Sequence, residues 1–157
     1  MVKQIQLSLT CLFISGCYYL QALPAIAENS IGFTSTAVLP PIALTPNTAL
    51  PSTNIGTVIV KSDNASGFTI SATSTNSGTL KRSSGEEIAY TLTYNGIEQG
   101  QLTLTSKVIE DVSSLITDFA DANGCNRAIE VAISQPAISA KPAGSYSDQI
   151  TFTLSVK

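Results

Sequence analysis

Apolar and polar residues alternate strictly at the end of the chain. In this stretch every second position is apolar and the positions between are Gln, Thr or Ser; the apolar residues are Ile150, Phe152, Leu154 and Val156. A period of two is typical of a strand with one face in a hydrophobic core, and we expect these four residues to form that face. One such strand, or even a hairpin, is marginal in water. The rest of the chain must therefore supply further strands and a second layer.

Further runs of strand-like sequence precede the last one. They are an apolar β-branched run and three alternating runs, at residues 55–61, 67–75, 88–94 and 128–134. Asn95-Gly96 directly follows the third of them, and Asn-Gly between two β-prone runs is a strong signal for a tight hairpin turn. We expect a returning strand over residues 97–105, with Leu102 and Leu104 facing inward and Gly100 in a bulge.

Two segments do not fit the alternating pattern. Residues 39–53 contain Pro40, Pro41, Pro46 and Pro51, so we expect an irregular crossing there and not a central strand. Residues 108–119 have apolar side chains at helical spacing but several poor helix formers, so a short helix and a loop followed by a strand both stay open.

These patterns together predict an all-β fold. Six to eight strands at short intervals, with turn residues between them and at most one short helix, are typical of an antiparallel β-sandwich. No βαβ spacing, phosphate-binding glycine loop or fixed-period repeat competes with this interpretation.

The N-terminus has the organisation of a secretory signal peptide. A single Lys precedes a mostly apolar run, and Ala25-Ile26-Ala27 offers small residues for cleavage after Ala27. The apolar run is short for a membrane span and no second one follows. We therefore predict a signal peptide at 1–27, a single domain at 28–157, and export to the periplasm, the bacterial cell surface or the medium. An alternative is lipid attachment at Cys17, because Ile14-Ser15-Gly16-Cys17 is similar to a lipoprotein processing site.

Composition excludes several classes of function. The chain has eight Lys and Arg against eleven Asp and Glu, and it has no basic cluster, so we do not expect nucleic acid as a partner. It has no His, so a Ser-His or Cys-His nucleophile cannot form, and we predict that the protein is not an enzyme. We select no catalytic residue, no metal ligand and no cofactor.

The number and positions of the cysteines limit the disulfides that the mature domain can form. Cys11 and Cys17 lie in the predicted signal peptide, so Cys125 would be the lone thiol of the mature domain, with no internal disulfide. Its alternative roles are a small buried hydrophobe, a free thiol and half of an intermolecular bridge.

Two motifs resemble the spore coat protein U family, which includes pilin subunits of archaic chaperone/usher systems. They are the hairpin Ile-Ala-Tyr-Thr-Leu-Thr-Tyr-Asn-Gly and the terminal Pro-Ala-Gly-Ser-Tyr-Ser-Asp-Gln-Ile-Thr-Phe-Thr-Leu. The resemblance implies an immunoglobulin-like sandwich that lacks one strand and is completed by the N-terminal arm of the next subunit. That arm would lie within residues 28–38, with Ile31, Phe33 and Ala37 on its inserting face. Members commonly have a cysteine pair, which the mature part of this chain lacks.

Two functional classes follow. The first is an exported structural or adhesive cell-surface subunit that assembles by β-strand complementation, with like subunits, a periplasmic chaperone and an outer-membrane usher as partners. The second is a stand-alone secreted or envelope β-sandwich that binds a carbohydrate or protein ligand.

Overall fold

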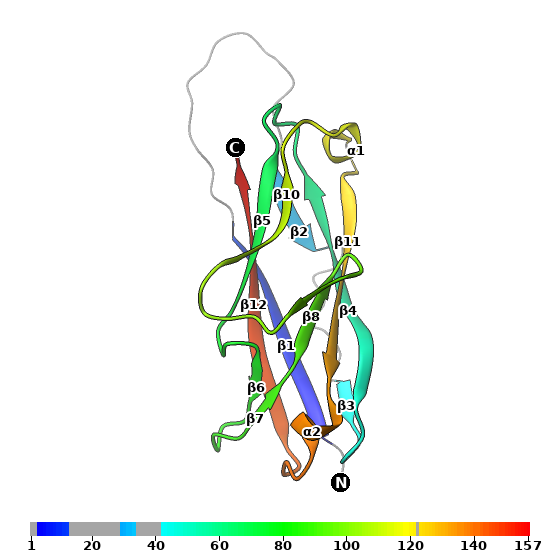
Figure 1. Cartoon of the computed structure of the whole chain (residues 1–157), viewed down its shortest axis with the longest axis vertical. Helices are drawn as coiled ribbons and strands as arrows, with labels where there is room; N and C mark the ends of the chain where they lie inside the picture. The colour runs from blue at the N-terminus through cyan, green and yellow to red at the C-terminus, as the bar shows by residue number, and fades with distance from the viewer. Residues whose placement is uncertain (1–2, 13–28, 34–41, 122) are drawn as a thin grey trace.

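The computed structural model describes residues 29–33, 42–121 and 123–157, and residues 3–12 as backbone. The fold is an antiparallel β-sandwich with two short helices in these residues, as the alternation predicts (Figure 1). Sheet A has the strand order β10-β5-β12-β1-β3, with β6 and β7 attached through β12. Its strands are β1 (Lys3–Leu12), β3 (Ile42–Leu44), β5 (Phe68–Ser74), β6 (Thr79–Lys81), β7 (Glu87–Ala89), β10 (Lys107–Val112) and β12 (Ser145–Val156).

Sheet B packs against sheet A and has the order β2-β4-β11-β8-β9. Its strands are β2 (Ser30–Phe33), β4 (Leu50–Lys61), β8 (Thr91–Tyr94), β9 (Ile97–Gly100) and β11 (Cys125–Ile133). The helices α1 (Thr117–Ala120) and α2 (Gln135–Ile138) are single turns at the ends of β11. Strands β7 and β8 belong to different sheets although only Tyr90 separates them, so the chain changes sheet at this residue.

The core lies between the two sheets and consists of the apolar residues that alternate in the sequence. In the run 88–94, Ile88, Tyr90, Leu92 and Tyr94 are at most 2% exposed. The same is true of the inward residues of β5 and β11, which are Phe68, Ile70, Ala72, Ile129, Val131 and Ile133. Burial of these apolar faces between the sheets is the main stabilising contribution in the described part of the sandwich.

The Asn95-Gly96 turn joins β8 to β9 as the sequence predicts. Both residues have positive φ, 49° and 77°, which is the conformation that a two-residue hairpin turn with the right twist requires. Gly100 also has a positive φ, and the β8–β9 register shifts opposite it, so the expected bulge is present.

The Pro-rich segment is more regular than expected. Strand β3 lies within residues 39–53, and β4 already begins at Leu50 and includes Pro51. The pairing of β4 with β11 shifts register between Val131 and Ile133, which is the part of β11 that faces Pro51. A proline lacks an N–H donor, and such an irregular site tolerates it without breaking the ladder.

The segment after the hairpin also differs from expectation. Strand β9 ends at Gly100; Leu102 is fully buried, but Leu104 is 69% exposed in a loop and does not face inward. Residues 107–112 form an edge strand of sheet A, and the helix that follows is one turn long. Phe119 anchors this turn through an edge-on contact with Phe68, with ring centroids 4.9 Å apart.

The sandwich also includes residues that the sequence assigns to the leader. Strand β1 lies inside sheet A, between β12 and β3 (Figure 1). The division into a leader at 1–27 and a domain at 28–157 stays a prediction. The sequence of β1 explains why it can pair there, because Ile5, Leu7, Leu9 and Cys11 alternate with polar residues at the period of a strand.

Candidate functional site

The candidate site is the position between β12 and β3, which we call the strand slot. Strand β1 fills it, running parallel to β12 from Gln4 opposite Ser145 to Leu12 opposite Thr153. On its other side β1 pairs antiparallel with β3 over Lys3 to Ile5. In the described part of the chain β3 pairs with no strand other than β1, so the slot strand is the link that holds β3 in the sheet.

One wall of the slot is the terminal strand β12. Ile150 and Phe152 are fully buried and Leu154 is 7% exposed, whereas Val156 is 48% exposed. The apolar face therefore ends one alternation earlier than the sequence pattern indicates, because Val156 lies at the end of the strand. Toward the other end the buried face continues to Asp148 and Tyr146.

The register pairs alternate residues of the slot strand with the buried residues of β12. Ile5, Leu7, Leu9 and Cys11 are the partners of the buried residues of β12, which are Tyr146, Asp148, Ile150 and Phe152. Strand β2 of sheet B contacts both β1 and β12 and closes the sandwich over the slot.

The predicted assembly arm lies in this closing strand. Ile31 is 1% exposed and pairs with Val60 of β4, and Phe33 pairs with Val58; Ala37 lies outside the described residues. The sequence suggests an arm that leaves the domain, but the structure has residues 30–33 in the sheet of their own domain. An apolar side chain such as Ile31 is stabilised wherever it is buried, and here its own core provides that burial.

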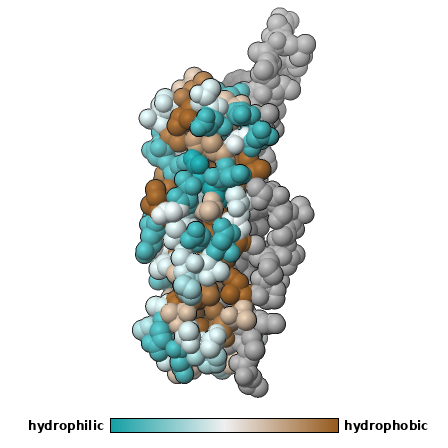
Figure 2. All heavy atoms as spheres, turned by 90° about the vertical axis from the view of Figure 1, so that its right-hand side faces the viewer, coloured by the Kyte–Doolittle hydropathy of each residue, from teal (hydrophilic) through white to brown (hydrophobic). Residues whose placement is uncertain are grey.

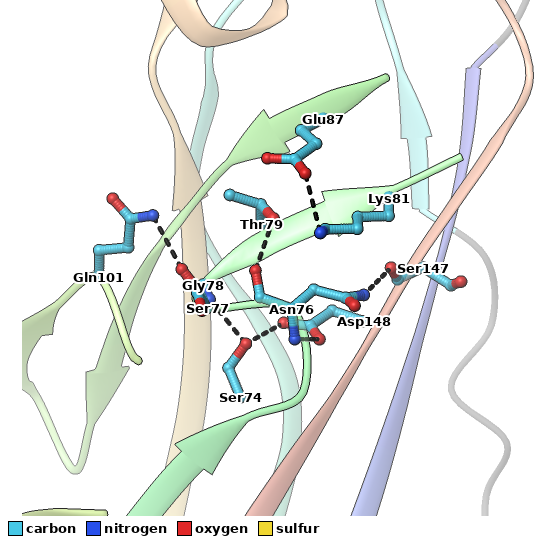
Figure 3. A network of polar contacts seen from close by, with 10 residues as sticks. All are labelled: Ser74, Asn76, Ser77, Gly78, Thr79, Lys81, Glu87, Gln101, Ser147 and Asp148. Atoms are coloured by element: carbon cyan, nitrogen blue, oxygen red, sulfur yellow. Dashed lines mark hydrogen bonds and ion pairs between the residues drawn. The ribbon is translucent and has the colours of Figure 1, made fainter. Parts of the chain in front are cut away.

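A buried carboxylate lies at the base of the slot wall (Figure 3). Asp148 is 3% exposed and accepts four hydrogen bonds. Oδ2 accepts from Ser74 Oγ at 2.6 Å and from the Tyr90 hydroxyl at 2.7 Å. Oδ1 accepts from the backbone N–H of Asn76 at 3.0 Å and of Gln149 at 2.7 Å. Four donors replace the water that the carboxylate loses on burial.

The position of Asp148 follows from the topology. Strand β12 pairs with β5 from Ile150 onward and with β6 at Ser147, so Asp148 faces the turn between β5 and β6. Ser74 also accepts a hydrogen bond from the backbone N–H of Gly78 at 2.6 Å, and the Asn76 amide donates to the carbonyl of Ser147 at 3.1 Å (Figure 3). This network joins β12 to the turn where the regular ladder is interrupted.

The same network changes the acidity of Tyr90. Burial, followed by the hydrogen bond to Asp148 and the charge of that carboxylate, raises the pKa of Tyr90 far above its ordinary value. The hydroxyl is therefore a fixed hydrogen-bond donor at neutral pH, which suits a structural role and not that of a general base.

A second polar cluster joins β10, at the edge of sheet A away from the slot, to β11 of sheet B. Arg127 of β11 forms a two-pronged contact with Glu110 of β10, with Nη2–Oε1 2.7 Å and Nε–Oε2 3.2 Å. The Tyr94 hydroxyl donates to Glu110 Oε2 at 2.8 Å, and the Arg127 guanidinium lies 4.7 Å from the centroid of the Phe119 ring. Both charged side chains are 16% exposed, so solvent screens this pair much less than a surface pair.

Cys125 lies beside this cluster at the start of β11. It is half-buried, and burial raises the pKa of its thiol, although the charge of Arg127 opposes the shift. A thiol with a raised pKa is mostly protonated at neutral pH and is a weak nucleophile.

Among the described residues lies a pocket of about 340 Å³. It is lined mainly by apolar atoms where the two sheets diverge at Tyr90, with Leu50, Ala132 and Ile133 on the sheet B side. On the side of the molecule that lies to the right in Figure 1, Figure 2 shows hydrophobic residues gathered in the lower part and hydrophilic residues across the middle. The Tyr90 hydroxyl is engaged by Asp148, so the pocket has no free titratable group among its lining residues.

Metal-binding clusters and membrane-spanning helices are two further features to look for in the described residues. No group of three His, Cys, Asp or Glu side chains there could hold a metal ion. The helices in the same residues are too short to cross a membrane.

The sequence interpretation missed both Asp148 and the slot. The signal for Asp148 was available, because it and Tyr146 fall on the same alternate positions as Ile150 and Phe152. The signal for the slot was the alternation in residues 4–11, which the signal-peptide interpretation treats only as an apolar run.

Comparison with known proteins adds no assignment. No protein-family model matches the chain, and no curated protein matches its sequence.

Proposed function

We propose that the protein is an exported structural or adhesive cell-surface subunit whose mature domain is completed by a β-strand from another chain. The observation that supports it is that the strand in the slot, β1, comes from the segment that export is expected to remove. Like subunits, a periplasmic chaperone and an outer-membrane usher are the proposed partners.

Loss of β1 would leave an incomplete sandwich. The edge of β12 would lose its ladder from Ser145 to Thr153, and β3 would lose its partner. Unpaired N–H and C=O groups along such an edge act as a template for another strand. The buried face at Ile150 and Phe152 would become a groove that takes alternate side chains of that strand, which is the basis of recognition by strand addition.

The position of β2 bears on which segment is donated. Ile31 is buried in its own domain, so the donor strand need not be residues 30–33 of a neighbour. A chaperone strand or another segment of a like subunit could fill the slot, because recognition depends on backbone pairing and alternate apolar side chains.

The test is to produce the full chain with its leader in a bacterial periplasm and to analyse the processed protein by size-exclusion chromatography. We expect it to assemble or aggregate when alone and to become a stable monomer when a synthetic peptide of residues 3–12 is added. The matched control is the same peptide with Leu7→Asp and Leu9→Asp, which should have no effect because charges are excluded from an apolar groove. A processed protein that is a stable monomer without peptide would contradict the proposal.

That contradictory outcome would favour the second candidate, a stand-alone binding domain. Burial of Ile31 within its own sheet favours this candidate, and the pocket near Leu50 and Ile133 offers a site for a small apolar group. A self-complete monomer should melt cooperatively and should not respond to the peptide.

A further inference from the structure

The pocket at Tyr90 lies where the ladder between β8 and β11 ends. The two strands pair as far as Thr91 opposite Ala132, and the chain of β8 then crosses to sheet A at Tyr90. Strand β11 continues to Ile133, and Ser134 follows it, so neither of these residues has a β8 residue opposite it. Both line the pocket, together with Thr91 and Tyr90. The change of sheet therefore opens the pocket.

Most of the lining is apolar. Tyr90 and Ile133 are at most 2% exposed, and Leu50, Ala89 and Ala132 add further apolar surface. The volume of about 340 Å³ lies at the small end of the roughly 300–1,000 Å³ that is usual for small-molecule pockets. The pocket is therefore suited to a compact ligand with one apolar group and not to a long chain.

The remaining lining residues offer hydrogen-bonding groups. The hydroxyls of Thr91 and Ser134 form no hydrogen bond within the described residues. The side-chain amide of Gln101 is partly engaged, because its nitrogen donates to the Ser77 carbonyl at 2.9 Å (Figure 3). Each hydroxyl can both donate and accept, and the Gln101 side-chain oxygen can accept.

Charge is absent from the lining, which contains no Asp, Glu, Lys, Arg or His. The hydroxyl of Tyr90 donates to Asp148, and this contact helps to keep its proton in place at neutral pH. A charged ligand would lose hydration in this pocket and meet no opposite charge among the lining residues. The lining therefore favours an uncharged ligand.

We propose that the pocket binds a small uncharged molecule in which a branched apolar group adjoins an amide. The apolar group would contact Tyr90 and Ile133, and the amide N–H and C=O would pair with the hydroxyls of Thr91 and Ser134. The pocket lies at β8 and β11, whereas the slot lies between β12 and β3. The site is thus independent of strand assembly and is compatible with both candidate functions.

The experiment titrates the isotope-labelled full chain with N-acetyl-L-leucinamide and follows the backbone amide signals by NMR. We expect the signals of residues 132–134 to shift and to saturate, with a dissociation constant on the order of millimolar for a ligand of about twelve non-hydrogen atoms. Unchanged signals at residues 132–134, at ligand concentrations well above millimolar, would overturn the proposal.

Two charged analogues test the requirement for a neutral ligand without any change to the protein. N-acetyl-L-leucine carries a carboxylate, and L-leucinamide carries an ammonium group at about pH 6.5. Each should bind at least roughly tenfold more weakly than the neutral amide, because the lining has no charge to replace lost hydration. A charged analogue that binds as tightly as the neutral amide would contradict the proposal.

Substitutions on β11 locate the site. Ala132→Leu fills the pocket and should weaken binding roughly tenfold or more, because the added side chain occupies the space of the ligand. Ala128→Leu is the matched control, since Ala128 is also half-buried on β11 but does not line the pocket. Ser134→Ala should weaken binding roughly 2- to 10-fold through loss of one hydrogen bond. Equal binding by the Ala132→Leu and Ala128→Leu proteins would place the ligand elsewhere and refute the site.

A longer peptide distinguishes a small ligand from a segment of another protein. Acetyl-Gly-Gly-Leu-Gly-Gly-amide presents the same side chain and amide within an extended chain. A small-molecule site should bind it no more tightly than N-acetyl-L-leucinamide. If only the peptide shifts the signals of residues 132–134, the occupant is a segment of another chain and the proposal of a small ligand is wrong.

Discussion

The Tyr90 hydroxyl donates a 2.7 Å hydrogen bond to Oδ2 of Asp148, at the residue where the chain passes from sheet A to sheet B. The contact joins this crossing point to the terminal strand, and both residues are at most 3% exposed. Because the Tyr90 side chain is buried against this carboxylate, Asp148 helps to raise the pKa of Tyr90.

The first prediction is a loss of stability at high pH. The pKa values of Tyr90 and Tyr94 are raised above the ordinary 10.0, by burial first and by Asp148 and Glu110 second. A raised pKa in the folded state means that the unfolded state releases the proton first. The stability is therefore fully present below pH 10 and is lost as pH rises above it, by roughly 1.4 kcal/mol per pH unit for each tyrosine. Chemical denaturation between pH 8 and 11.5 measures this slope.

Single variants identify the groups responsible. Tyr90→Phe and Tyr94→Phe should each make the decline above pH 10 shallower. At pH 7 Tyr90→Phe should cost about 1–2 kcal/mol, because Asp148 loses one of its four donors. A slope unchanged in both variants would mean that neither tyrosine is responsible.

The second prediction concerns the core face of β12. Phe152→Ala should lower the free energy of unfolding by roughly 3–5 kcal/mol, because it leaves a cavity beside Tyr94 in a closely packed core. Val156→Ala is the matched control, and we expect a change within about 0.5 kcal/mol because Val156 is half exposed. Urea denaturation of the full chain measures both, and similar losses would show that Val156 also belongs to the core.

The third prediction compares two ion pairs. Arg127→Ala should cost about 2–4 kcal/mol, since it leaves Glu110 with one donor in a mostly buried position. The pair Lys81–Glu87, whose side chains are almost half exposed, should contribute less than about 0.5 kcal/mol. Double-mutant cycles for both pairs measure the coupling directly. Equal coupling energies would contradict the difference in burial.

The fourth prediction concerns the segment that the sequence suggests as an arm. Ile31→Asp buries a charge against the domain's own core, so the melting temperature of the full chain should fall by several degrees. Ser30→Asp, at a half-buried position of the same strand, is the control. If Ile31→Asp melts like the unchanged chain yet fails to assemble on cells, the segment acts outside its own domain.

The fifth prediction concerns processing. Mass spectrometry of the native protein should find Glu28 at the N-terminus. A diacylglyceryl group on Cys17 would instead indicate a lipid-anchored protein, in which residues 18–27 remain attached.

The elements that sequence predicts well are those in which local pattern and tertiary packing agree. In residues 88–94 four large side chains alternate with Ala or Thr and all four are buried, and Asn95-Gly96 has the backbone that its residue types favour. The turn follows from the residue types of two neighbours in the sequence, and the alternation shows which side chains of the strand need burial. The fold class follows because several such runs can bury their faces only against each other.

The sequence-based predictions differ from the structure where contacts between distant segments determine the conformation. Pro51 is accepted in a strand because its partner β11 is irregular opposite it, and Leu104 is exposed because the chain leaves the sheet after Gly100. The slot is a property of two segments more than a hundred residues apart in sequence, β1 and β12. Local periodicity shows that each is a strand but not that they are neighbours.

The buried carboxylate of Asp148 also fixes how the terminal strand is aligned. The sequence from Ile150 to Ser155 repeats an apolar residue followed by Thr or Ser, so sliding the strand by two residues would preserve its hydrophobic match with β5 almost unchanged. Such a slide would disturb the hydrogen bonds that Asp148 accepts from the Ser74 hydroxyl and the Asn76 backbone N–H, and a buried carboxylate that loses donors costs free energy. Asp148 thus favours the observed register of β12 with β5 over a register shifted by two residues. Because β12 is held in that register, another strand that pairs with it finds its backbone groups in fixed positions.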